Sequence, residues 1–131
     1  MNARRHVNRH IRRLTLGALL LSLSGWAQAL DAQPFSAQAL SQAQREGRAV
    51  ALHFHADWCP VCGAQQRALK GLDLKNLTLL TVDYDRAIDL KRQHRVRAQS
   101  TLLVFKGDKE TARLVGDTEA DVLRKALQSA L

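Results

Sequence analysis

The chain has 131 residues, of which 46% are hydrophobic and 24% are charged, and this length leaves room for one small folded domain. Its formal net charge of +8 is unevenly placed, because five of the 20 basic residues and none of the 12 acidic ones lie before position 30. The rest of the chain carries only about three more positive than negative charges, by simple count. That balance excludes a nucleic-acid footprint, so we expect no nucleic-acid partner. We also expect the protein to be a monomer.

The first 29 residues have the order of an export signal. A basic head is followed by an apolar run from Leu14 to about Trp26 and then by the small residues of Ala27-Gln28-Ala29. The run is shorter than the ~20 residues that a membrane-spanning helix needs. We therefore predict a signal peptide at 1–29, cleaved after Ala29, with an uncleaved membrane anchor as the alternative.

A linker is predicted at 30–35, and the remaining residues, 36–131, alternate between helical and strand patterns. Ser36 is a helix cap and Gly47 a helix stop, and Pro60 suits the first turn of a second helix. The patterns predict helices at 36–46, 60–70 and 86–94, a last helix capped by Asp117 or Thr118, and strands at 49–54, 77–82, 101–106 and 110–115. Strands alternating with helices indicate an α/β domain with a central mixed sheet of about four strands, closed by an antiparallel hairpin.

Both cysteines of the chain lie in one short motif, at Cys59 and Cys62. A structural disulfide framework normally uses more cysteines at wider spacing, and so small a loop constrains the unfolded chain little. Redox chemistry explains the pair better. Cys59 precedes the predicted helix at Pro60, whose free backbone N–H groups and dipole favour an anion. We expect Cys59 to be the nucleophile and Cys62, one turn deeper, the resolving thiol.

Several stretches resemble the thioredoxin family. Trp58-Cys59-Pro60-Val61-Cys62 is similar to its W-C-x-x-C active site, and Ala56-Asp57-Trp58-Cys59 to periplasmic relatives that read A-D-W-C. Similarity extends through 80–85, 96–97 and 101–107 to Gly116, so the resemblance covers 36–131. It implies a thioredoxin fold and thiol–disulfide exchange with protein substrates, without an organic cofactor. The extra N-terminal strand of fuller thioredoxins has no clear candidate here.

Three positions depart from the family pattern. Ser100 stands where the family usually has a cis-proline, directly before Thr101 of the third strand. His53 stands where the family often has a buried Asp beneath the second cysteine, and Thr81 where it frequently has Lys. A cis bond before a non-proline residue costs ~2.5–4 kcal/mol, so we expect the Gln99–Ser100 bond to be trans. These departures bear on redox tuning and on substrate docking.

Two of these residues carry specific hypotheses. A neutral imidazole at His53 would accept the proton of Cys62, and the alternative is a core histidine hydrogen-bonded to the backbone. The Ser100 hydroxyl would donate a hydrogen bond to the Cys59 thiolate, and the alternative is that it merely fills the loop. Trp58 would cover the edge of the site and offer apolar contact to a polypeptide, or simply pack.

A metal site is the alternative use of the same residues. His53 and His55 lie two apart and therefore share one face of a strand. They would form, with the two cysteines, a possible ligand set for zinc or copper, His53, His55, Cys59 and Cys62.

The leader and the motif together predict a periplasmic thiol–disulfide oxidoreductase. Resemblance to the A-D-W-C relatives favours a reductant, recharged by an integral-membrane thiol transporter. Two other functions stay open, a disulfide-donating oxidant and a periplasmic metal-binding module.

Overall fold

The computed structural model describes residue 30 and residues 32–131, and the predicted signal peptide at 1–29 lies outside them. No helix in this described part is long and apolar enough to cross a membrane. The elements follow one another as β1 (Ala32–Pro34), α1 (Ala37–Arg45), β2 (Ala49–His55), α2 (Pro60–Lys70), β3 (Leu77–Asp83), α3 (Ile88–Gln93), β4 (Thr101–Lys106), β5 (Lys109–Val115) and α4 (Ala120–Gln128).

The sheet is mixed, with the strand order β1-β3-β2-β4-β5. The strands β1, β3 and β2 run parallel, and β4 and β5 are antiparallel additions on the other side of β2. β2 is buried along nearly its whole length, as expected of a central strand covered on both faces. The predicted α/β architecture with a closing hairpin is therefore confirmed.

The segment predicted as a linker instead forms an edge strand. Its backbone pairs with β3, from Ala32 opposite Leu79 to Pro34 opposite Thr81. The Leu30 N–H donates to the Leu72 carbonyl at 2.8 Å, and the Leu30 side chain is buried. A proline is tolerated at the sheet edge, where its missing N–H breaks no ladder bond. The sheet consequently has five strands rather than about four.

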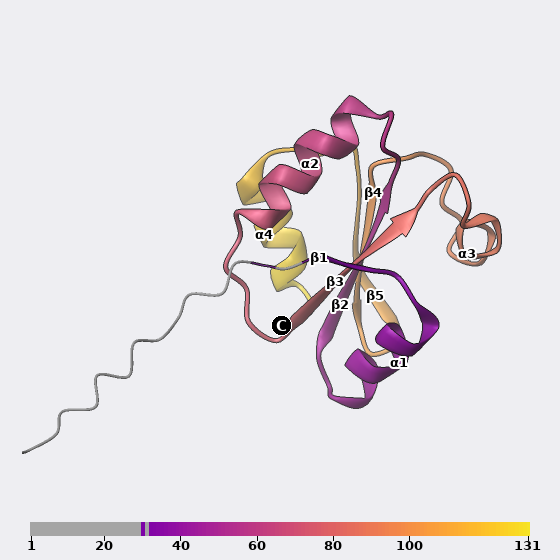
Figure 1. The fold of residues 1–131 in the computed structure, drawn as a ribbon. Helices are drawn as coiled ribbons and strands as arrows, with labels where there is room; N and C mark the ends of the chain where they lie inside the picture. The colour runs from indigo at the N-terminus through magenta and orange to yellow at the C-terminus, as the bar shows by residue number, and fades with distance from the viewer. Residues whose placement is uncertain (1–29, 31) are drawn as a thin grey trace, which may run out of the picture.

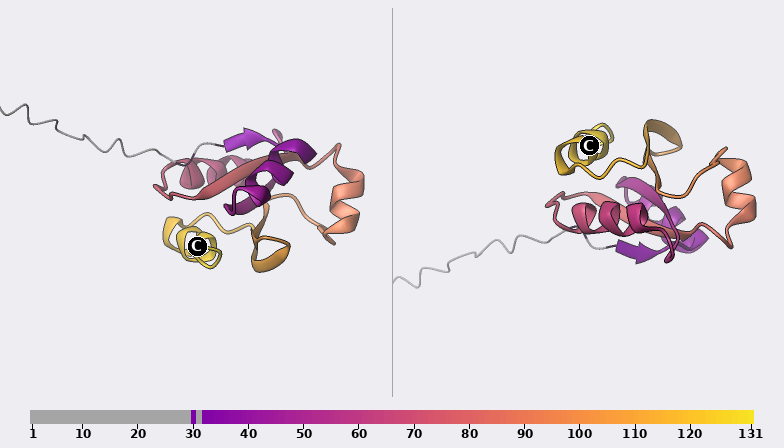
Figure 2. Two further views of the ribbon diagram at one scale, coloured as in Figure 1. Left: turned by 90° about the horizontal axis from the view of Figure 1, so that it is seen from below. Right: turned by 90° about the horizontal axis from the view of Figure 1, so that it is seen from above.

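Helices cover both faces of the sheet, with α2 and α4 on one side and α1 and α3 on the other (Figures 1 and 2). On the first side, leucines of α2 and α4, such as Leu69 and Leu123, pack with alternate residues of the strands. On the second side, Ala43 of α1 and Leu90 of α3 pack with the intervening strand residues, Phe54 among them. The same strands thus contribute to two separate cores.

The helix ends depart from the predicted caps in two places. The Ser36 Oγ accepts from the Ala39 N–H at 3.0 Å and caps α1 as predicted. α3 is shorter than predicted, because the Asp83 carboxylate accepts two backbone N–H groups just before it and holds that segment as a turn. α4 begins at Ala120, with Glu119 rather than Asp117 or Thr118 at the cap position.

Candidate active site

The two cysteines lie at the N-terminal end of α2, where β2 leads into the helix. Cys59 is the cap residue, and its Sγ accepts a hydrogen bond from the Cys62 N–H at 3.1 Å. Pro60 occupies the first turn, where its missing N–H leaves no backbone bond unmade. Both thiols are free. The sulfur of Cys59 therefore occupies a position that favours an anion, as the sequence predicts.

The two thiols differ in their access to solvent. Cys59 is 5% exposed, whereas Cys62 is 0% exposed. Burial raises the pKa of the Cys62 thiol, and the adjacent Cys59 adds to this effect. The Ala56 backbone and the Ser100 hydroxyl act in the opposite direction on the same pKa. An incoming disulfide thus meets Cys59 first, and Cys62 needs help to lose its proton.

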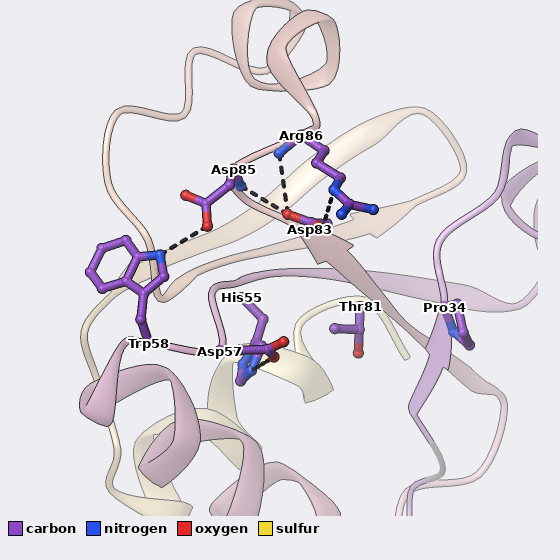
Figure 3. A pocket seen from close by; sticks show the side chains of 8 residues that line it. All are labelled: Pro34, His55, Asp57, Trp58, Thr81, Asp83, Asp85 and Arg86. Carbon is purple, nitrogen blue, oxygen red and sulfur yellow. Dashed lines mark hydrogen bonds and ion pairs between the residues drawn. The ribbon is translucent and has the colours of Figure 1, made fainter.

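The rim of the site is apolar and accessible. Trp58 is 62% exposed, and its indole Nε1 donates a hydrogen bond of 2.8 Å to the Asp85 carboxylate (Figure 3). Val61, one residue beyond Pro60, is also exposed. The hydrogen bond between Trp58 and Asp85 holds the indole ring against the loop after β3. One face of the ring can then contact a polypeptide.

Ser100 lies in the loop before β4 and has a different partner from the one predicted. The Gln99–Ser100 bond is trans, as expected, and Ser100 has a φ of +60°. Its N–H donates to the Phe54 carbonyl at 2.8 Å, and its hydroxyl donates to the Gln65 side-chain Oε1 at 3.2 Å rather than to Cys59. The next residue, Thr101, donates its hydroxyl to the Ala98 carbonyl and so secures the loop. The effect of the Ser100 hydroxyl at the site is on the buried cysteine, since it lowers the pKa of Cys62.

Gln65 is a site residue that the sequence analysis missed. It lies on α2 and is completely buried, with its Oε1 bonded to Ser100 and its Nε2 donating to the Asp117 carbonyl at 2.7 Å. It links the loops before β4 and after β5 to the active-site helix. The signal for it was present in the spacing, since Cys62, Gln65 and Leu69 fall on one helical stripe.

His53 lies on the α2 side of β2, beneath the active-site helix. It is completely buried, and within the described part of the chain neither ring nitrogen has a hydrogen-bond partner. The alternative of a core histidine bonded to the backbone is therefore wrong. The pKa of His53 is lowered to about 4, mainly by burial and also by the neighbouring His55, while Gln65 offsets part of the effect. The imidazole is neutral at neutral pH.

His55 joins this buried region to an open pocket. Its ring is 5.4 Å from that of His53, centroid to centroid, and its Nε2 is 3.3 Å from the Asp57 Oδ1. A pocket of about 560 Å³ opens beside them, as Figure 3 shows. The lining residues are Pro34, His55, Asp57, Trp58, Thr81, Asp83, Asp85 and Arg86.

The four residues of the metal alternative do not form a site. Over residues 30 and 32–131, no three His, Cys, Asp or Glu side chains converge closely enough to hold a metal ion. The rings of His53 and His55 meet edge to face, with centroids 5.4 Å apart. The arrangement supports exchange chemistry at sulfur and does not favour metal binding.

Comparisons with known proteins agree with this geometry. The thioredoxin family profile matches residues 29–129. Thioredoxin H5 of Oryza sativa subsp. japonica is 31% identical over 88 residues, which span 66% of this chain and 65% of the rice protein, slightly under two thirds of its length. Thioredoxin of Chlamydia trachomatis is 35% identical over 80 residues, spanning 60% of this chain and 78% of that protein.

A solved structure gives the same result in three dimensions. Trxlp from Edwardsiella tarda EIB202 superposes with a TM-score of 0.69 at 35% identity, over 74% of this chain and 98% of that one. The residues that the family profile matches include the segment that carries both cysteines. This chain therefore belongs to the thioredoxin family of thiol–disulfide oxidoreductases.

Proposed function

We propose that this protein is an exported thiol–disulfide oxidoreductase that reduces disulfides of protein substrates in the periplasm. The observation that carries the chemistry is the Cys59 Sγ, which accepts the Cys62 N–H at the start of α2 and lies beside the exposed Trp58. An anion is stabilised there, and an apolar rim is available to a polypeptide.

The reaction proceeds in two exchanges. The Cys59 thiolate attacks one sulfur of the substrate disulfide, forming a mixed disulfide and releasing the other substrate sulfur as a thiolate. Cys62 then loses its proton and attacks Cys59, which closes the Cys59–Cys62 disulfide and releases the second substrate thiolate. Burial disfavours the charged form of Cys62, so the second exchange is the step that depends on a proton acceptor.

His53 is our candidate for that acceptor. It is buried on the strand beneath α2, and it acts next to Gln65, which follows Cys62 by one helical turn. Its ring is neutral at neutral pH, with one nitrogen free to accept. A His53→Leu variant is expected to form the mixed disulfide normally and to resolve it slowly.

The cysteine roles are tested with a matched pair of variants. Cys62→Ser is expected to accumulate a stable mixed disulfide with a substrate protein, detected as a mass adduct, because nothing resolves it. Cys59→Ser is expected to form no adduct under the same conditions. An adduct on Cys59→Ser and none on Cys62→Ser would reverse the assignment.

The direction of electron flow is tested by the reduction potential of the cysteine pair, measured by equilibration with glutathione buffers. A value near the ~−270 mV of thioredoxin is expected for a reductant recharged by an integral-membrane thiol transporter. A value near the ~−120 mV of a strong periplasmic oxidant would make the protein a disulfide donor instead.

The export part of the proposal rests on the pattern of the first 29 residues. Expression of the whole chain in a Gram-negative host is expected to yield a periplasmic product that begins at Leu30, as measured by intact mass. A full-length product in the membrane fraction would favour the anchor.

A further inference from the structure

Four buried polar atoms lie together beneath the active site without protein partners. Within the part of the chain that the structure describes, His53 Nδ1 and Nε2, His55 Nδ1 and Thr81 Oγ1 make no hydrogen bond. His53 and Thr81 are paired across β2 and β3, so their side chains lie on the same face of the sheet, and His55 follows two residues along. Buried polar groups are normally satisfied, and exceptions concentrate where water or protons move.

The outer end of this group is connected to solvent. The His55 Nε2 is 3.3 Å from the carboxylate of Asp57, which is fully exposed. That contact assigns the Nε2 proton to the side facing Asp57 and leaves Nδ1 as a free acceptor on the buried side. His55 and Thr81 both line the open pocket (Figure 3), whereas His53 does not.

The inner end cannot store a proton. His53 is completely buried, with His55 and Gln65 as polar neighbours, and a charge held on its ring is disfavoured. An imidazole can, however, accept a proton at one nitrogen while releasing another from the second. The proton taken from Cys62 therefore has to leave His53 as it arrives.

We propose that His55 and Asp57 form a proton relay that carries the Cys62 proton from His53 to solvent during the resolving exchange. This inference rests on the proposed roles of Cys62 and His53. The Cys62 Sγ–H bond breaks and its proton goes to one His53 nitrogen, while the other His53 nitrogen gives its proton to His55 Nδ1. The ring centroids are 5.4 Å apart. One water beside Thr81 would bridge the two rings, so that the proton crosses this distance along two hydrogen bonds.

The last step delivers the proton to the pocket. His55 passes its Nε2 proton to the Asp57 carboxylate, which is open to water. The released substrate thiolate takes up a proton from solvent, so the exchange is balanced without any further reagent. The charged groups that line the pocket with His55 are Asp57, Asp83, Asp85 and Arg86. The side chains that act on the His53 ring are His55 and Gln65, and Cys62 lies on the helix that covers this face of β2.

The test separates the two exchanges in time. Reduced protein mixed with 5,5′-dithiobis(2-nitrobenzoic acid) releases one nitrothiobenzoate when Cys59 attacks and a second when Cys62 resolves. The second phase is independent of reagent concentration, so stopped-flow absorbance gives its rate directly. His55→Phe is expected to slow the second phase by about tenfold or more at pH 7 and to leave the first unchanged. Asp57→Asn, at a fully exposed position, is expected to slow it by a smaller factor.

The pH profile and a control distinguish relay from structure. The rates of His55→Phe and wild type are expected to converge at high pH, where hydroxide removes the Cys62 proton. The matched control is His94→Phe, since His94 packs on Phe105, away from the cysteines, and no change is expected. Added imidazole, which the pocket of about 560 Å³ admits, is expected to restore the second phase in His55→Ala.

The relay is overturned if His55→Phe resolves at the wild-type rate at pH 7. It is also overturned if the variant is slower by one constant factor at every pH, or if imidazole leaves His55→Ala unchanged. A wild type without any second phase would instead remove Cys62 from its proposed role, and the relay with it.

Discussion

The two faces of β2 are built from alternate residues of the same segment, and they differ in kind. Towards α1 and α3 the strand presents Val50, Leu52 and Phe54, which pack with other apolar side chains. Towards α2 and α4 it begins with small residues and ends with His53 and His55 at the active-site end. Only the second face carries buried polar atoms without partners.

The difference separates stability from chemistry along one strand. The α1 side gains free energy of folding from apolar burial, at about 25 cal/mol per Å². The α2 side loses some of that gain, because burying an unpaired polar group costs about 1–3 kcal/mol. Along β2 this loss is confined to His53 and His55, at the end of the strand that leads to the cysteines. Four experiments test or sharpen this contrast, and they follow in order of expected effect.

The largest effect is expected from Phe54→Ala, on the apolar face. Phe54 is completely buried, so the variant should lose about 3–5 kcal/mol of unfolding free energy in urea titrations. The folded fraction should still attack and resolve at wild-type rates. A large change in the resolution rate would show that the two faces are not independent.

The next largest effect is expected from Ser100→Pro, which restores the residue usual in the family. Ser100 has a φ of +60° and donates its N–H to Phe54, and proline allows neither. We expect a loss of about 3 kcal/mol in thermal or urea unfolding. Ser100→Gly, which accepts positive φ, is the control and should change stability by only about 1 kcal/mol. Equal stability of the proline variant and wild type would contradict the observed loop geometry.

A change of similar size in the free energy of unfolding is expected when the pH is lowered. The pKa of His53 is lowered from 6.5 to about 4 in the folded state, so the unfolded chain takes up that proton first. The contribution of His53 to stability is therefore complete above pH 6.5 and is lost as the pH falls towards 4, by roughly 3 kcal/mol.

His53→Leu is the variant that isolates this contribution. It should remove that part of the pH dependence and be as stable as wild type, or more so, at pH 7. The pKa of His94 is also lowered by burial, so the quantity to compare is the difference between the two urea titration series. Identical pH dependence in both would show that His53 is not the group responsible.

The smallest effect is expected from Asp85→Ala at the rim. It removes the hydrogen bond to Trp58 Nε1, which lies at the surface and contributes about 0.5–1 kcal/mol at most. Global stability should hardly change, while the Trp58 fluorescence should report a freer ring. Asp108→Ala, in the β4–β5 turn, is a matched surface control.

Much of the fold follows from local pattern. Apolar strands alternating with capped helices predict the order of the elements from α1 to α4. β1 was missed because three residues containing a proline have no strand pattern of their own, and they become a strand only by pairing with β3. The starts of α3 and α4 were missed for a related reason, since the Asp83 turn and the bond from Gln65 to Asp117 depend on tertiary contacts.

The site was predictable to the extent that its chemistry lies in one short motif. Cys59, Cys62 and Pro60 are fixed relative to one another by helix geometry alone. The partner of Ser100 was not predictable, because Gln65 and Ser100 meet only when α2 packs over β2 and β4. A glutamine in an amphipathic helix is normally expected to face solvent. Only its position on the same helical stripe as Cys62 and Leu69 indicates that Gln65 is buried.

The fixed position of Leu30 has a consequence for when the predicted signal peptide can be removed. Leu30 is buried and held by Leu72, and the edge strand follows within two residues. A peptidase cutting directly before Leu30 has to grip an extended stretch on both sides of the bond, and the stretch on the far side is β1. If the chain is cleaved after Ala29, as we propose, processing at this bond has to precede the docking of β1 on β3.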